Sequence, residues 1–288
     1  MAMGLDVLRG KTRPQRRLAG RLWQARLRPA PSSGNPLVIF AIPLISKARA
    51  GDWGRVSANL AATLDSLAAQ RSGSWAALVC GQDRPEGVDL ERVGGGRVRF
   101  VPYRGRAKFY DKGDKRLALI DAAMAAFAGR DGYYAQWDAD DLLHPDAVGH
   151  VTAGDNGRGY LINRGYMADL AANVFAPIGP DAAEGGRPFW QACGSCAFVR
   201  YDFRAQPGHW RRLLRRMSSH TRIPDWMALS GMPLEELGFP AAIYAFNHGE
   251  NMRRRRGKDA GRLAALEARA LPPEEVARVR AAFALPPA

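Results

Sequence analysis

The sequence predicts an α/β fold with a mostly parallel central sheet flanked by helices. Its first sign is the apolar run of residues 37–42, which is bounded by prolines and is typical of a buried parallel strand. The second sign is that apolar strands and amphipathic helices alternate from there to the strand that begins at Tyr133. Such alternation favours parallel strands, because helices usually form the crossovers between them.

The elements of the first half follow in a regular order. After the first strand, one helical face carries four apolar residues: Val56, Leu60, Leu64 and Leu67. Residues 75–80 and 98–101 indicate the second and third strands. A second amphipathic helix, entered through residues 111–116, is marked by Leu117, Ile120, Met124 and Phe127. The Tyr133 strand comes next.

The second half, after about residue 150, is less regular. Strand-like patterns occupy residues 159–166 and 191–201, and helical patterns occupy residues 209–217 and 224–229. A last strand is expected at residues 243–246. Beyond Arg256 the chain is rich in Ala, Leu, Arg and Glu, which predicts a helical extension at the periphery of the fold.

The Tyr133 strand ends abruptly in a cluster of three acids, Asp138, Asp140 and Asp141. In extended backbone, residues i and i+2 point to the same face. Asp138 and Asp140 should therefore face one site, and Asp141 should turn back towards the protein. Like charges this close need a compensating group, and carboxylates are the ligands that Mg²⁺ or Mn²⁺ prefers. The alternative is an acidic turn whose Asp residues cap the next helix.

Charge and cysteine content bound the environment of the chain. The 288 residues carry a formal net charge of +14. Eight Lys or Arg residues and one Asp lie in residues 1–34, a leader that would suit anionic lipid, nucleic acid or an acidic polymer. Three cysteines argue against a disulfide framework and fit a reducing compartment, and Cys193 and Cys196 are expected to be packing residues.

The leader has two open interpretations. Leu18, Leu22 and Ala25 at helical spacing, with Trp23 and several arginines nearby, would form a basic amphipathic helix on a membrane surface. The alternative is a solvated tail. The first 30 residues contain no apolar stretch typical of a signal peptide. The longest apolar run, residues 36–45, is shorter than the 20 or so residues that cross a bilayer. We therefore expect a cytoplasmic protein, which the leader would attach peripherally to the inner face of the membrane.

Several polar residues are expected to converge on one edge of the sheet. They are Asp83 after the second strand, Lys112, Lys115 and Arg116 before the second helix, the acid cluster, and His248 after the last strand. The carboxyl ends of parallel strands gather at one edge, so these residues would build a single crevice. Carboxylates with a metal ion, lysines at a helix start and a histidine make a diphosphate site. Taken singly, Lys115 and Arg116 are more often solvated charges and His248 more often an ordinary histidine.

This order of residues resembles family-2 glycosyltransferases with the GT-A fold. The resemblance covers about residues 36–252 and is carried mainly by the D-x-D-D run at Asp138 and by the H-x-x-N run from His248 to Asn251. The matching pieces outside those two motifs are Ile42-Pro43, a helix with Leu60, Leu64, Ser66-Leu67 and Gln70, then Asp83 and Pro224-Asp225-Trp226. Two features depart from the family pattern. The acidic segment after the second strand is reduced to Gly81-Gln82-Asp83, and Pro224 stands where the family has a Glu.

The resemblance implies a role for each matching residue. Asp83 would face the nucleotide base, and Asp138 the ribose or the metal. Asp140 would be the main ligand of Mn²⁺ or Mg²⁺, with His248 beside the metal or the diphosphate. Gly194 and Ser195 would leave room for donor and acceptor. Asp225 would be the general base, at the start of a helix. Its neighbour Trp226 would offer a platform for a sugar ring. Glu235 and Glu236 are the competing acids.

The resulting expectation is a metal-dependent glycosyltransferase. It would move a sugar from a nucleoside-diphosphate sugar, with UDP favoured, to a hydroxyl of a glycan or lipid-linked acceptor, with inversion favoured. Residues 1–34 would be the leader, 35–150 the nucleotide-sugar half, 151–252 the acceptor half and 253–288 the C-terminal extension. A sugar-phosphate nucleotidyltransferase is the alternative, although the loop at residues 43–51 has only one glycine for a triphosphate. A nucleic-acid-binding protein is a further alternative, but no aromatic-interleaved basic motif accompanies the charge.

Overall fold

The computed structural model describes residues 31–108, 111–180, 186–250 and 260–286. The amphipathic helix expected in the leader lies outside the described residues. In the described part, no helix has both the length and the apolar character needed to span a bilayer.

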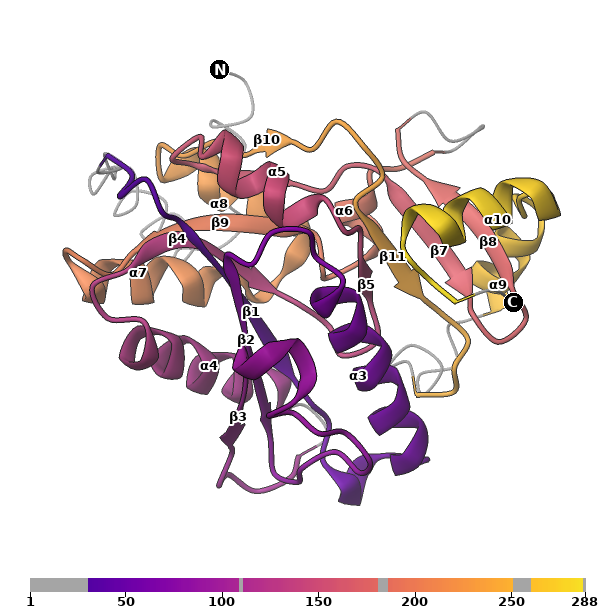
Figure 1. The fold of residues 1–288 in the computed structure, drawn as a ribbon, viewed down its shortest axis with the longest axis horizontal. Coiled ribbons are helices and arrows are strands. Elements are labelled where there is room, and N and C mark those ends of the chain that lie inside the picture. Colours follow the sequence, from indigo (N-terminus) through magenta and orange to yellow (C-terminus); the bar gives the residue numbers. More distant parts are fainter. Residues whose placement is uncertain (1–30, 109–110, 181–185, 251–259, 287–288) are drawn as a thin grey trace, which may run out of the picture.

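The core of the molecule is a seven-stranded sheet (Figure 1) in the order β10-β6-β9-β4-β1-β2-β3. Its strands are β1 (Leu37–Pro43), β2 (Trp75–Gly81), β3 (Val98–Pro102), β4 (Asp131–Gln136), β6 (Gly159–Leu161), β9 (Ala197–Asp202) and β10 (Glu235–Glu236). All neighbouring pairs are parallel except those of β9, which runs antiparallel to β4 and to β6. The predicted fold class, a mostly parallel sheet flanked by helices, is confirmed.

Helices cover both faces of this sheet. Figure 1 shows α3 (Trp53–Ala68) and α5 (Ala147–Gly154) on one side and α4 (Lys112–Ala126) and α7 (Pro207–Leu214) on the other. The predicted apolar face of α3 is buried. Gln70, which lies just after the end of α3, binds the backbone of the residues that follow the acid cluster. The Gln70 side chain donates to the carbonyl of His144 (2.9 Å) and accepts from the amide of Val148 (3.0 Å). Gln70 therefore fixes the chain that follows the three acids.

A second sheet, which the sequence patterns did not predict, lies beside the first. Its strands, in the order β5-β11-β7-β8, are β5 (Leu142–Leu143), β11 (Ala242–Ala245), β7 (Gly165–Asp169) and β8 (Val174–Ile178). The strand expected at residues 159–166 is thus divided between the two sheets. The strand expected at residues 191–201 is instead α6 (Phe189–Ala192) followed by β9.

The described part of the C-terminal extension is helical, as predicted, and one side of it packs into the fold. Helices α9 (Ala260–Glu267) and α10 (Pro273–Ala282) lie against the second sheet (Figure 1). Val276, Val279 and Phe283 are buried against Ile243 and Phe175 of that sheet. The extension completes the core of the second sheet because it covers apolar side chains that would otherwise be exposed.

A buried ion pair ties β4 to β9 beneath the start of the described chain. Asp131 and Arg200, both 0% exposed, are ion-paired, and Asp131 also accepts from the amide of Ser33 at 3.1 Å. Burial would raise the pKa of Asp131, but the hydrogen bonds from Ser33 and Arg200 outweigh it and lower the pKa. The ionised Asp131 therefore stabilises the folded protein at pH values above 3.8, the ordinary pKa of this group. That stabilisation is lost as the pH falls through the lowered pKa of the folded state.

Replacing Asp131 with Asn is expected to lower the free energy of unfolding by about 3 kcal/mol, because it leaves the buried Arg200 guanidinium with only the more distant Asp155, at 3.7 Å, as a counter-charge. Urea denaturation measures the change. The matched control is Arg211→Gln, which breaks the solvent-exposed pair between Arg211 and Asp121 and should cost about 1 kcal/mol or less. Equal losses in the two variants would contradict a special role for the buried pair.

Candidate active site

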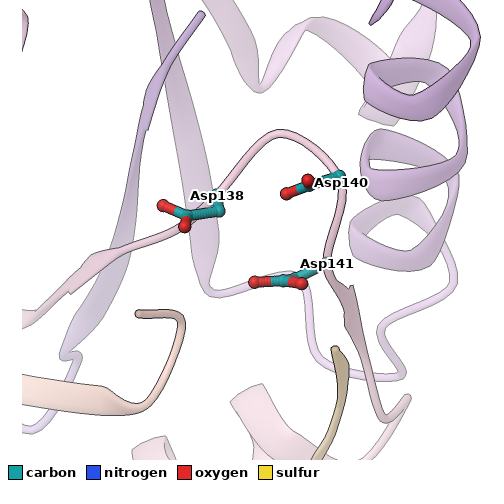
Figure 2. A group of neighbouring side chains, drawn as sticks. All are labelled: Asp138, Asp140 and Asp141. Carbon is teal, nitrogen blue, oxygen red and sulfur yellow. The ribbon is translucent and has the colours of Figure 1, made fainter. Parts of the chain in front are cut away.

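The three acids lie on one arched turn that follows β4. Figure 2 shows Asp138 on one limb of the arch and Asp140 and Asp141 on the other. Each offers a carboxylate oxygen, and these oxygens lie within 4.8 Å of one another. Trp137, which is fully buried, fixes the turn because its Nε1 donates to the carbonyl of Asp141 at 3.0 Å. A side chain of the core therefore helps to position the turn.

Asp141 turns into the protein, as the alternation of residues along an extended strand predicts. It is 0% exposed and accepts hydrogen bonds from the Ser195 hydroxyl (2.6 Å) and the Cys193 thiol (3.0 Å). Burial, followed by the charges of Asp140 and Asp138, raises its pKa well above the usual range. Cys193 and Cys196 are both buried free thiols, in agreement with the expected packing role.

Asp138 is held by two basic residues of the first turns of α4. The Lys112 ammonium lies 2.7 Å from its Oδ1 and the Arg116 guanidinium 4.0 Å from the same atom. Burial would raise the pKa of Asp138, but Lys112 and then Arg116 outweigh it and lower the pKa. Asp138 is therefore an ionised carboxylate with cations beside it.

Gly194 and Ser195, in the segment between α6 and β9, lie next to Asp138. The backbone amide of Asp138 donates to the Ser195 hydroxyl at 2.8 Å. A Cβ atom at position 194 would lie 3.2 Å from Oδ2 of Asp138, which is tighter than ordinary van der Waals contact. The segment predicted to leave room near the acids therefore lies directly against one of them.

Asp140 is paired with His248, which follows β11. Nε2 of His248 lies 2.8 Å from Oδ2 of Asp140, while Nδ1 accepts from the backbone amide of Glu250 at 3.3 Å. A backbone amide can only donate, so in the neutral ring the proton is on Nε2. In this tautomer His248 donates to Asp140. It would bind a metal ion through Nε2 only after that proton had left.

Lys115 and Asp83 lie at the same edge of the sheet, and the contacts described for them are with neighbouring loops. Lys115 is 1% exposed, and its ammonium donates to the carbonyl of Leu44 (2.6 Å) and pairs with Asp111 (3.0 Å). Asp83 accepts from the backbone amide of Lys47 at 2.8 Å, which joins the loops after β1 and β2. Neither has a described contact with the three acids.

Asp225 lies in the first turn of α8 (Ile223–Leu229), where an ionised carboxylate is favoured. It is ion-paired with Arg222 at 3.2 Å, and no described contact joins it to the acid turn. Trp226 is only 9% exposed, and the Arg222 guanidinium lies 5.6 Å from its ring centroid. The hypothesis that Trp226 offers an open platform for a sugar ring is therefore wrong.

The competing acids lie on the edge strand β10. Glu235 accepts from the side-chain amide of Asn156 (3.1 Å), and Glu236 from that of Asn163 (2.6 Å).

His220 is a candidate site residue that the sequence patterns did not indicate. It opens η4 (His220–Arg222), and its Nδ1 lies 2.7 Å from the carbonyl of Trp190 in α6. Since a carbonyl only accepts, Nδ1 carries the proton and Nε2 of the neutral ring is an acceptor. A positive charge on His220 contributes to the lowered pKa of Asp138, although less than Lys112 and Arg116 do. A single histidine before a short helix belongs to no spaced motif, so nothing in the sequence indicates that it lies near the site.

The donor set fits a divalent cation. Asp138 and Asp140 supply carboxylate oxygens of the kind that Mg²⁺ and Mn²⁺ bind, and these oxygens lie close enough to that of Asp141 to share one ion. Lys112 and Arg116 of α4 lie beside the carboxylate of Asp138. This arrangement can hold an anion next to a metal ion.

Comparisons with known proteins find likeness only among solved structures. No family model matches the chain, and no curated protein matches it. A structure of 4-diphosphocytidyl-2C-methyl-D-erythritol synthase is 12% identical over 80% of this chain and 98% of that chain, with a TM-score of 0.38. The glycosyltransferase GlyE of Streptococcus pneumoniae TIGR4 is 11% identical over 83% of this chain and 65% of that chain, with a TM-score of 0.38. The apo form of GlyE is 12% identical over 84% of this chain and 52% of that chain, with a TM-score of 0.36. Likeness of this degree assigns no function to the chain.

Proposed function

We propose that the protein is a metal-dependent glycosyltransferase that moves a sugar from a nucleoside-diphosphate sugar, with UDP favoured, to a hydroxyl acceptor with inversion. The observation that carries the proposal is the acid turn, in which Asp138 lies against Lys112 and Asp140 against His248. This turn follows a strand of a mostly parallel sheet, at the edge where such sheets bind ligands. The resemblance of the D-x-D-D and H-x-x-N runs to family-2 glycosyltransferases supports the same conclusion.

The residues divide the chemistry between them. Asp138 and Asp140 would hold Mg²⁺ or Mn²⁺, with His248 beside them, and the bound ion would supply positive charge to the diphosphate. Lys112 and Arg116 add positive charge where the leaving nucleoside diphosphate becomes more negative. Gly194 keeps the space next to Asp138 free of a side chain. Asp225 would take the proton of the acceptor hydroxyl. Asp83 would contact the base, and Ser195 would hold the acid turn.

Nucleotidyl transfer is the competing reaction, because it too uses carboxylates, a divalent ion and lysines. That chemistry needs a loop after β1 whose amides hold a triphosphate. Here the loop contains η1 (Lys47–Arg49), and the amide of Lys47 already donates to Asp83. The geometry therefore favours transfer of the sugar.

The products distinguish the two reactions. The full-length protein is incubated with a panel of sugar nucleotides, Mn²⁺ and simple hydroxyl acceptors, and separately with nucleoside triphosphates and sugar phosphates. We expect a nucleoside diphosphate in the first set and no pyrophosphate in the second. Pyrophosphate release that depends on a sugar phosphate would establish nucleotidyl transfer instead.

A further inference from the structure

His248 has a second side-chain contact, with Asn59 of α3. Nδ2 of the Asn59 amide lies 3.0 Å from Nδ1 of His248. The backbone amide of Glu250 donates to the same nitrogen at 3.3 Å. On the other side of the ring, Nε2 of His248 lies 2.8 Å from Oδ2 of Asp140. Asn59, His248 and Asp140 therefore form a chain of side chains that ends at the acid turn.

The neighbours of Nδ1 decide where the proton of the neutral His248 ring lies. The backbone amide of Glu250 can only donate, so Nδ1 accepts. The Asn59 side chain faces the same nitrogen with its NH₂ group, which is also a donor. Two donors at Nδ1 leave the proton of the ring on Nε2. That nitrogen therefore donates to Asp140 and has no lone pair to offer a metal ion.

The loop that carries His248 is attached to the amino end of α3. The Glu250 carboxylate accepts from the backbone amides of Gly51 (3.0 Å) and Asp52 (2.9 Å), which lie just before the first residue of α3. A carboxylate is favoured there by the positive end of the helix dipole. Asn59 belongs to the same helix, so one element holds both the loop and the amide that faces the ring.

The positions of the ligand atoms agree with a donor role for His248. Among the described residues, Asp138, Asp140 and Asp141 are those whose ligand atoms lie within 4.8 Å of one another, and His248 does not belong to that group. No hydrogen bond between described residues involves Oδ1 of Asp140, whereas Oδ2 is held by His248. Asp140 can therefore present Oδ1 to a metal ion while His248 stays bonded to Oδ2.

We propose that His248 is a positioning residue and not a metal ligand, and that Asn59 fixes it in that role by donating to Nδ1. His248 orients the Asp140 carboxylate through its Nε2–H, and the ligands that the protein gives to the ion are carboxylates. The part that concerns the metal ion rests on the proposed function. To bind the ion through Nε2, the ring would have to carry its proton on Nδ1, opposite two hydrogen-bond donors.

The first test determines the tautomer in the metal-free full-length protein labelled with ¹⁵N-histidine, at a mildly alkaline pH where imidazole is neutral. Long-range ¹H–¹⁵N spectra distinguish a protonated ring nitrogen from an unprotonated one, and the signals missing from His248→Gln belong to His248. We expect the proton on Nε2 in the unmodified protein. Asn59→Leu, which keeps the approximate size of the side chain but has no donor, should show a mixture of the two tautomers.

The matched control is Ala58→Leu, which adds a leucine at a neighbouring, exposed position of α3 and should leave the tautomer unchanged. A proton on Nδ1 of His248 in the unmodified protein would overturn the proposal. A tautomer that stays wholly Nε2–H in Asn59→Leu would show that Asn59 does not fix the ring.

The second test measures the affinity for Mn²⁺ alone, from the electron paramagnetic resonance signal of the free ion. His248→Gln can place an NH₂ donor near the position of Nε2, so Mn²⁺ affinity should stay within about threefold. His248→Leu has no donor and should lose about 10- to 100-fold, as is typical when a group that orients a ligand is removed. Asn59→Leu should lose about tenfold. Thermal unfolding of each variant shows whether it is folded.

A loss of the same size in His248→Gln and His248→Leu would make His248 a metal ligand and overturn the proposal. Failure of the unmodified protein to bind Mn²⁺ would contradict the proposed function. The tautomer of His248 is read without any metal ion, so the two failures are distinguishable.

Discussion

Replacing Asp225 with Asn lowers the rate of sugar transfer by about 10² or more if this residue is the general base, because a positioned base typically contributes about 10²- to 10⁴-fold. Asn keeps the size of the side chain and its ability to accept a hydrogen bond at the start of α8. It removes only the proton acceptor and the charge that pairs with Arg222. We therefore expect near-normal thermal stability and near-normal nucleotide binding, with the loss confined to the rate constant of transfer.

Three matched variants make this measurement decisive. Glu235→Gln and Glu236→Gln remove the competing acids of β10 and should transfer sugar at close to the unmodified rate. His220→Gln removes the imidazole that contributes to the lowered pKa of Asp138. Should Asp225→Asn remain fully active while one of these three variants is slowed by about 10², the base is that other residue and the assignment of Asp225 is wrong.

Replacing Asp140 with Asn is expected to abolish the stabilisation that a nucleoside diphosphate gives in the presence of Mn²⁺. A ligand at 100 times its dissociation constant adds about 2.7 kcal/mol to the stability of the native state, which raises the melting temperature. The amide of Asn is a weaker ligand for a divalent ion than a carboxylate is. The melting temperature of the variant without ligands should stay close to that of the unmodified protein, since Asp140 contacts only His248 among the hydrogen bonds described.

The matched control for Asp140 is Asp146→Asn, which changes a partly exposed acid between β5 and α5 that is paired with Arg71. This variant should retain the full shift with Mn²⁺ and nucleoside diphosphate. A metal-dependent shift of normal size in Asp140→Asn would place the metal elsewhere in the protein.

Strands β1 to β4 of the central sheet were predictable because each is a short run rich in apolar residues between turn residues. Strand β10 was not predictable, because both of its residues are glutamates. The inward turn of Asp141 was predictable for a related reason, because the alternation of residues along the strand sets the side to which each of the three acids points. The direction of β9 was not predictable, since periodicity gives the faces of a strand but not its orientation. The second sheet escaped prediction because β5 and its neighbours are short, and pairs such as β11 with β7 join distant parts of the chain.

The basic residues of α4 show where site prediction from sequence ends. Lys112 and Arg116 are one helical turn apart and share a face, and both reach Asp138. Lys115 is offset from that face and is buried against the carbonyl of Leu44. The three residues look alike in the sequence, and only packing against β1 separates their roles. His220 was not predicted as a site residue, because its position depends on a contact with the backbone carbonyl of Trp190 in α6.

We propose that the acid turn binds a metal ion and a nucleoside-diphosphate sugar for sugar transfer. The product released from a sugar nucleotide is the most direct test of this proposal. The unmodified full-length protein is incubated with each sugar nucleotide and a hydroxyl acceptor, first with a chelator and then with Mn²⁺ in excess. We expect nucleoside diphosphate and glycosylated acceptor to form in equal amounts, and only after Mn²⁺ is added. Transfer that proceeds equally well with the chelator, or pyrophosphate formation from a nucleoside triphosphate and a sugar phosphate, would contradict it.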